Sequence, residues 1–143
     1  MKAQQRTLDS LLSESEPNGT FHDSSLLSWD IDLENQVLIA TFNICVGNPE
    51  ADSEKERERW RRGQLRVDGV KVWEIEPCDP KTFQPLWVHD DGLLGDCSTD
   101  RAKVLVKHTG PDDYAWYIFF GQQNAFAYIM GRRAQFLWQQ IAV

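Results

Sequence analysis

The chain has 143 residues, 41% of them hydrophobic and 26% charged, a balance typical of one soluble domain and unlike a disordered or membrane-spanning chain. The formal net charge is −7, and residues 1–48 and 74–113 each have a net charge of −5. Because nucleic-acid backbones are bound by Lys and Arg, this charge argues against nucleic acid as a ligand and favours a basic protein partner.

Residues 1–19 predict a short helix followed by a turn. Leu8, Leu11 and Leu12 recur at helical spacing, and Pro17-Asn18-Gly19 then ends regular structure. The N-terminus has no apolar signal segment, and no run of apolar residues is long enough to span a membrane. We therefore expect a cytoplasmic protein.

Two strands and a tight turn follow. Leu27, Trp29 and Ile31 alternate with polar residues, which predicts a half-buried strand with these three side chains on one face. The β-branched run Val37–Val46 predicts its partner, and residues 33–36 supply the turn of the hairpin.

Residues 50–62 contain five acids and five bases around Trp60. This composition is typical of a charged connection, either helical or mobile, and we favour a partial helix. Beyond it, Gln64–Asp68 and Val70–Glu76 alternate around the turn-forming Asp68-Gly69 dipeptide, which predicts a hairpin or one bulged strand.

The rest of the chain alternates irregular and extended segments. Pro77–Gly95 holds three prolines and predicts the longest irregular connection. Val104 and Val106 alternate with charged residues and predict a strand over Lys103–Lys107. Three further strands are expected, with a bulge or a turn at Gly131-Arg132-Arg133 between the last two: Tyr114–Phe120, Ala125–Met130 and Ala134–Trp138.

These elements predict one α+β domain over residues 1–143, mainly antiparallel β. The β-rich core spans residues 20–138 and forms one meandering, twisted sheet or a sandwich, with a short N-terminal helix. Parallel crossovers are not expected, because no helical segment recurs between strands.

Phe21-His22-Asp23 is the motif that could supply an acid–base pair or two metal ligands. A metal-dependent hydrolase would need His22 and Asp23 to converge with Asp30 or Asp32 in a cleft. Adjacent residues of an extended segment point to opposite faces, so we favour a structural role. In that role Asp23 caps a turn and Phe21 anchors the segment on the core, while His22 and Asp23 stay a candidate polar site.

Two other sets could bind metals but lack a metal-binding pattern. Asp30, Asp32 and Glu34 form an acidic row without the glycine and the bidentate glutamate of a calcium loop, so a solvated strand face is expected. The soft ligands are spread singly, unlike the paired ligands of zinc modules: Cys78, His89, Cys97 and His108. No metal or other cofactor is expected, and the odd number of cysteines, which includes Cys45, indicates free thiols.

The tryptophans divide into two groups. Trp29, Trp73, Trp116 and Trp138 lie in expected strands, where core packing is the simpler interpretation. Trp60 and Trp87 lie in charged or proline-rich connections and are candidates for an exposed partner contact. With the neighbouring acids, the residues expected to contact a partner are Trp60, Trp87, Asp90, Asp91, Asp30 and Asp32.

The order of these features resembles a group of small bacterial β-sheet proteins. In that group a Phe-His-Asp-small segment precedes an apolar strand with an acidic end and then a sheet, matched here by Phe21-His22-Asp23-Ser24, Leu27–Asp32 and Val37–Val46. The closing part is also similar, through Phe120-Gly121, Ala134 and Phe136. Some members are immunity proteins of polymorphic toxin systems, which neutralise a cognate toxin in the cytoplasm, and many are uncharacterised.

We therefore expect a non-enzymatic, cytoplasmic protein that binds a protein partner, and the resemblance implies an immunity-like, toxin-neutralising role. The alternative is a small-molecule or carbohydrate-binding module that uses an aromatic-lined face or cleft. A third hypothesis is the metal-dependent hydrolase based on His22 and Asp23. The sequence holds no glycine-rich phosphate loop and no nucleophile elbow.

Overall fold

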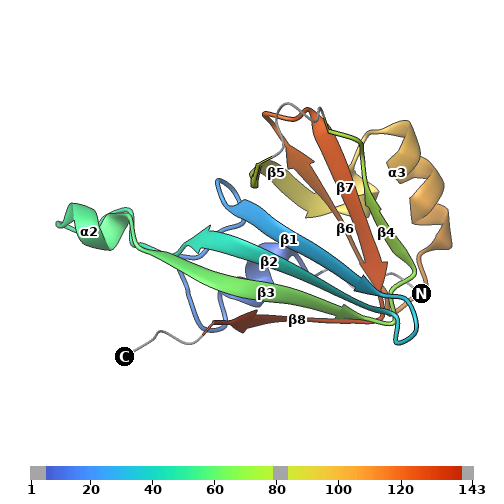
Figure 1. The fold of residues 1–143 in the computed structure, drawn as a ribbon, viewed down its shortest axis with the longest axis horizontal. Helices are drawn as coiled ribbons and strands as arrows, with labels where there is room; N and C mark the ends of the chain where they lie inside the picture. The colour runs from blue at the N-terminus through green and yellow to red at the C-terminus, as the bar shows by residue number, and fades with distance from the viewer. Residues whose placement is uncertain (1–5, 79–83, 140–143) are drawn as a thin grey trace.

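The computed structural model describes residues 6–78 and 84–139 (Figure 1). None of the helices in this described part of the chain combines the length and apolar character of a membrane-crossing segment. In chain order the elements are α1 (Leu8–Leu12), β1 (Ser25–Asp32), β2 (Val37–Cys45), α2 (Glu54–Arg57), β3 (Trp60–Asp68), β4 (Val72–Ile75), β5 (Leu86–Leu93), η2 (Leu94–Asp96), α3 (Asp100–Leu105), η3 (Val106–His108), β6 (Tyr114–Phe120), β7 (Ala125–Gly131) and β8 (Arg133–Trp138).

The strands form one eight-stranded sheet in the order β4-β7-β6-β5-β1-β2-β3-β8, and every pairing is antiparallel. This confirms the predicted mainly antiparallel class, as a single sheet. The sheet is weakest at its centre, where β1 and β5 pair only through Ser25 with Trp87 and Leu26 with Leu86. We call β1, β2, β3 and β8 the first half of the sheet, and β4, β5, β6 and β7 the second half.

The inner faces of the two halves share one hydrophobic core. Phe42 and Leu65 of the first half are fully buried, as are Trp116 and Ile118 of the second half. The three leucines of α1 join the same cluster and cover it from the inner side. Each large apolar side chain buried in this way contributes about 1.5–3 kcal/mol, which is why the strands alternate apolar and polar residues.

A smaller cluster lies on the outer face of the second half. There η2 and α3 pack Leu94, Ala102 and Leu105 against Tyr128 and Met130 of β7. Figure 1 shows α3 beside β4 and β7, away from the first half. A helix therefore covers part of this outer face.

The structure confirms the terminal helix and two hairpins. Thr7 caps α1 by accepting a hydrogen bond from the Ser10 N–H at 3.2 Å. In the β1–β2 turn, Asp32 accepts hydrogen bonds from the backbone and side chain of Asn35. The β6–β7 hairpin turns through Asn124, whose φ of 48° suits asparagine.

The charged segment 50–62 is partly helical, as favoured, but the helix is short. Ser53 caps α2, whose four residues bury no side chain. From Trp60 onward the chain already belongs to β3, which pairs with β2 over its whole length. Figure 1 shows α2 projecting beyond the end of the sheet.

The first strand begins at Ser25, and a bulge changes which leucine is buried. Leu26 pairs with Phe42 whereas Ser28 pairs with Thr41, so Leu27 is the extra residue of β1. As a result Leu26 enters the core, and the predicted inward position of Leu27 is wrong. Beyond the bulge, Trp29 and Ile31 pack on the core as expected.

The predicted hairpin around Asp68-Gly69 is wrong, because its two strands belong to different halves. β3 pairs with β2 and β8, whereas β4 pairs with β7 at the opposite edge of the sheet. Gly69 has a φ of 64°, and the Lys71 N–H then donates to the Met130 carbonyl at 2.8 Å. On this edge strand Trp73 is 41% exposed and is not a core residue.

Two further predictions are wrong. Pro77–Gly95 contains β5 and is not one irregular connection, and Lys103–Lys107 forms the end of α3 and the start of η3. Val104 is exposed whereas Ala102 and Leu105 are buried, so burial follows helical spacing and not the alternation of the valines.

Gly131-Arg132-Arg133 is a turn between two strands, not a bulge. β7 ends in the second half at Gly131, and β8 begins in the first half at Arg133. A Cβ atom at Gly131 would lie 2.4 Å from Val67 Cγ1. The close approach of the two halves at this corner therefore requires glycine.

Candidate functional site

The Phe21-His22-Asp23 segment lies against β5. The Asp23 N–H donates to the Val88 carbonyl and the Val88 N–H donates to the Ser24 carbonyl, both at 2.8 Å. Phe21 is fully buried, and its ring lies edge-on to Phe42 at a centroid distance of 4.9 Å. The anchoring role predicted for Phe21 is confirmed.

His22 and Asp23 form a pair on the surface. Asp23 has a φ of 67°, and this left-handed turn brings its Oδ2 within 3.0 Å of His22 Nδ1. The expectation that the two side chains diverge is therefore wrong. Both are more than half exposed, at 57% and 53%, and the His22 ring lies 6.1 Å from the ring of His89 on β5.

A row of aromatic side chains crosses β5, β6 and β7 beside this pair. The ring centroids of Trp87 and His89 lie 5.3 Å apart, those of His89 and Phe119 lie 6.0 Å apart, and those of Phe119 and Phe126 lie 4.7 Å apart. Tyr117 adjoins Phe126 at 6.2 Å. Four rings and an imidazole thus form one continuous run.

Strand alternation places this row on the outer face of the second half. Trp116, Ile118 and Phe120 fill the core, so Tyr117 and Phe119 point the other way. The α3 cluster covers the neighbouring part of the face and stops at the row, which stays only partly buried.

The carboxylate of Asp90 borders the row on β5. A bulge between Val88 and Asp90 places both His89 and Asp90 beside Phe119. The Tyr117 hydroxyl donates to Asp90 Oδ2 at 3.2 Å, and burial together with the Asp90 charge raises the pKa of Tyr117 to about 12.

Asp91 lies next in the strand and pairs with Ile118, whose side chain fills the core, so its partly exposed carboxyl lies on the inner side of the sheet. Burial raises the pKa of Asp91 to about 7, with further increases from the charges of Asp9 and Asp90, while His22 lowers it. Asp9 is fixed by accepting the Phe21 N–H at 2.8 Å. We define the β5 surface as the aromatic row and its bordering groups on the outer face: Trp87, His89, Tyr117, Phe119, Phe126, Asp90, His22 and Asp23.

The other predicted partner residues lie elsewhere. Asp30 and Asp32 are exposed at the end of β1 far from its contact with β5, roughly 20 Å along the strand. Trp60 is 47% exposed at the start of β3, on the far side of β2 from β1. The structure brings together His22, Asp23, Trp87 and Asp90 and separates them from Asp30, Asp32 and Trp60. It places Asp91 on the inner side of β5.

Within residues 6–78 and 84–139, no group of three His, Cys, Asp or Glu side chains is placed to hold a metal ion. In the acidic row of β1, Asp32 is engaged with Asn35, whose hydrogen bonds lower the pKa of the aspartate. The soft-ligand set is dispersed, with Cys78 after β4, His89 on β5, Cys97 between η2 and α3, and His108 at the end of η3.

Sequence reasoning missed the aromatic part of the β5 surface. Tyr114–Phe120 is apolar at nearly every position, so alternation alone does not distinguish its outer face from its inner face. Because prolines flank β5, its sequence was interpreted as an irregular connection. The placement of His89 and Asp90 on one face of a strand was therefore not predicted. The available signal was the local alternation of Trp87, Val88 and His89.

Comparisons with protein-family models, with curated proteins and with solved structures find no match to this chain. The function is therefore argued from the site itself.

Proposed function

We propose that the chain is a non-enzymatic, cytoplasmic domain that binds a basic protein through the β5 surface. A toxin neutralised by complex formation is the partner that the resemblance of the Phe21-His22-Asp23 region implies. The observation that carries the proposal is the partly exposed aromatic row with carboxylates along its border.

The aromatic row has the properties of a binding hot spot. Trp and Tyr dominate the energetics of protein interfaces because they offer large contact areas with few rotatable bonds. Phe119 and Phe126 already pack against each other, and Trp87 is held by His89 and by the close approach of Gly121. Little side-chain entropy is then lost when a partner covers them.

The bordering charges indicate the sign of the partner. Asp90 lies beside the row, and the chain as a whole has a net charge of −7. A basic partner would be steered by this field, and its Lys or Arg side chains could pair with Asp90 or lie over the Trp87 ring. Such a partner adds apolar contact and charge pairing at one place.

The proposal is tested by co-expressing the chain with the product of a toxin-like gene adjacent to its own, followed by growth measurement and co-purification. We expect protection and a stable complex. Trp87→Ala with Phe119→Ala should weaken the complex at least about tenfold, because both substitutions remove hot-spot contacts. If the chain gave no protection and formed no complex, the assignment would be overturned.

Trp60→Ala is the matched control. Trp60 is exposed, like the row, but lies at the start of β3 and outside the β5 surface. The Trp60 variant should protect as well as the unchanged chain. If it lost binding while the Trp87 variant retained it, the binding surface would lie on the first half.

A pocket favours a second candidate function, the binding of an apolar small molecule. This pocket of about 540 Å³ lies between β1 and the segments that follow β4 and precede β5. Most of the lining is apolar, and includes Leu26, Leu27, Trp29, Ile75, Pro77 and Leu86. Saturable binding of a fluorescent naphthalene sulfonate, abolished by Leu27→Glu and unaffected by Trp87→Ala, would support this function.

A further inference from the structure

No helix in the described part of the chain covers the outer face of the first half. α1 packs on the inner side of these strands, and α3 belongs to the second half (Figure 1). The strand register aligns the outward residues in three rows across β1, β2, β3 and β8: Asp32, Val37, Asp68 and Arg133; Asp30, Ile39, Arg66 and Gln135; Ser28, Thr41, Gln64 and Leu137.

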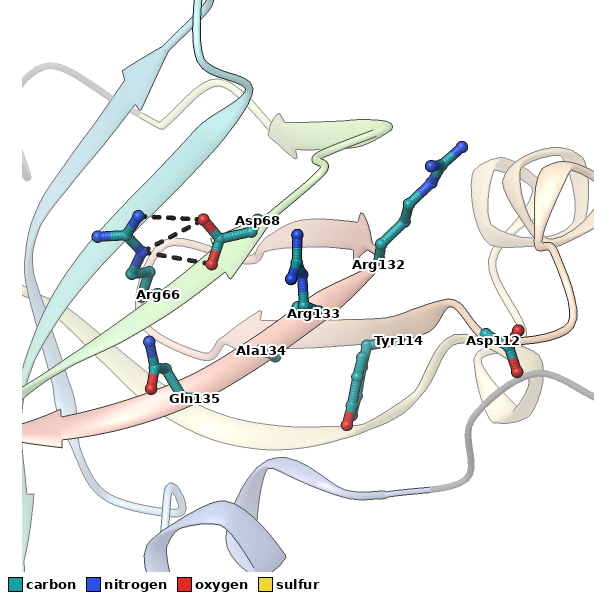
Figure 2. A pocket seen from close by; sticks show the side chains of 8 residues that line it. All are labelled: Arg66, Asp68, Asp112, Tyr114, Arg132, Arg133, Ala134 and Gln135. Atoms are coloured by element: carbon teal, nitrogen blue, oxygen red, sulfur yellow. Dashed lines mark hydrogen bonds and ion pairs between the residues drawn. The ribbon is translucent and has the colours of Figure 1, made fainter.

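Acidic and basic side chains occupy opposite margins of this face. Asp30 and Asp32 form the β1 margin. Arg66 on β3 and Arg133 on β8 form the other margin, and Figure 2 shows their side chains on the same side of the strands. They line a pocket of about 580 Å³ together with Arg132.

Asp68 does not reverse the sign of the basic margin. Its carboxylate accepts hydrogen bonds from Arg66 at 3.1 and 3.3 Å (Figure 2), which neutralises one arginine. Asp112 also lines the pocket, so Arg66, Arg132 and Arg133 exceed Asp68 and Asp112 by one positive charge. Arg133 lies directly opposite Asp68 in the register. The pairing of β3 with β8 therefore fixes the positions of the charged residues in the basic margin.

Apolar side chains lie within the face. Val37 and Ile39 of β2 are partly buried between the two charged margins. Leu137 of β8 is 46% exposed. An apolar patch bordered by charged margins has the anatomy of a protein interface, with a dry centre and a polar rim.

This arrangement is complementary to itself. A two-fold axis that lies in the interface and runs parallel to the strands superimposes the β1 margin of one copy on the β3–β8 margin of the other. In the strand register Asp32 then meets Arg133 twice, and β2 of one copy lies over β3 of the other. Packed sheets keep their strands within about 30° of each other, which this operation allows.

We infer that the outer face of the first half binds the same face of a second copy of the chain. Four strands with these rows project roughly 500 Å² per copy, and side-chain relief increases the accessible area. This projected area is smaller than the roughly 800 Å² per partner of a standard interface. The dimer is therefore of micromolar affinity and dissociates on dilution.

Charge exchange tests the inference. Sedimentation of the full chain should show a monomer–dimer equilibrium at about 1–100 μM. Asp32→Lys and Arg133→Glu should each give monomers, because like charges then meet twice. An equimolar mixture of the two variants should recover the dimer. In one contact of that mixed dimer the introduced lysine faces the introduced glutamate, and in the other the unchanged Asp32 faces the unchanged Arg133.

Leu137→Glu tests the same face without altering Arg133 or its neighbour Asp68. Circular dichroism verifies that every variant is folded. This variant should also be monomeric. A wild-type chain that stays monomeric up to about 100 μM, or a mixture that fails to recover the dimer, would overturn the inference. Neither result bears on the β5 surface, which lies on the other half of the sheet.

Discussion

Asp91 connects the pH of the solution to the stability of the fold. Its pKa is about 7 in the folded chain, against an ordinary value near 3.8. Between about pH 4 and 7 the unfolded chain has lost this proton and the folded chain has not, so the free energy of unfolding falls as the pH rises. Asp91→Asn removes this dependence and should stabilise the fold by about 1–2 kcal/mol above pH 7, after allowance for solvent screening at a partly exposed site.

Urea unfolding of the wild-type chain and of Asp91→Asn at about pH 5 and about pH 8 measures this effect. The stability difference should be larger at the higher pH. Asp30→Asn is the control, because this carboxylate is exposed on β1 and far from β5. A difference between Asp91→Asn and the wild type that stayed constant with pH would contradict the assignment.

Phe21 and His22 are neighbours with opposite expected roles. The Phe21 ring is fully buried between Phe42 at 4.9 Å and Phe136 at 5.8 Å, whereas the His22 side chain is mostly exposed. Phe21→Ala should destabilise the fold by about 3–5 kcal/mol, and Phe21→Leu by less, because each leaves a cavity. His22→Ala should change stability by less than about 0.5 kcal/mol. Thermal and urea unfolding separate the two, and equal effects would contradict this division.

At the level of elements, α3 depends on its cap. The Thr99 hydroxyl accepts the Ala102 N–H at 3.1 Å and lies 2.9 Å from the Tyr128 hydroxyl, so it joins the helix to β7. Thr99→Ala should cost about 1–2 kcal/mol, and Thr99→Ser should retain most of the stability. Hydrogen exchange of α3 and β7 is the measurement. Protection lost in α3 while global stability is unchanged would indicate a local opening of the helix and would contradict the predicted cost.

The same helix shows why part of the fold escapes sequence reasoning. Val104 and Val106 alternate as in a strand, yet Ala102 and Leu105 are the buried positions. The Thr99 cap was a local signal for a helix, but a window of six residues satisfies both periods. The two confirmed hairpins, by contrast, have long strands and turn residues in which Asp32 and Asn124 stabilise the turn locally.

For the whole molecule, topology is the part that local patterns predict least well. The Asp68-Gly69 turn is correct in conformation but joins β3 to a strand at the opposite edge of the sheet. Which strand β4 pairs with depends on which sheet faces bury apolar surface. This is decided by residues far apart in the sequence. The candidate site shows the same division: His22, Asp23, Trp87 and Asp90 were identified from the sequence, but their convergence depends on the pairing of residues 23–24 with Val88.

The two proposed surfaces lie on different halves of the sheet, so their effects should be independent. Trp87→Ala should weaken partner binding without changing self-association, and Asp32→Lys should do the reverse. Mutations at distant sites without shared contacts add within about 0.5 kcal/mol, so the double variant should show the sum of both losses. Sedimentation without the partner and titration with it measure the two equilibria separately. A Trp87→Ala chain with altered dimerisation would show that the narrow β1–β5 contact couples the halves.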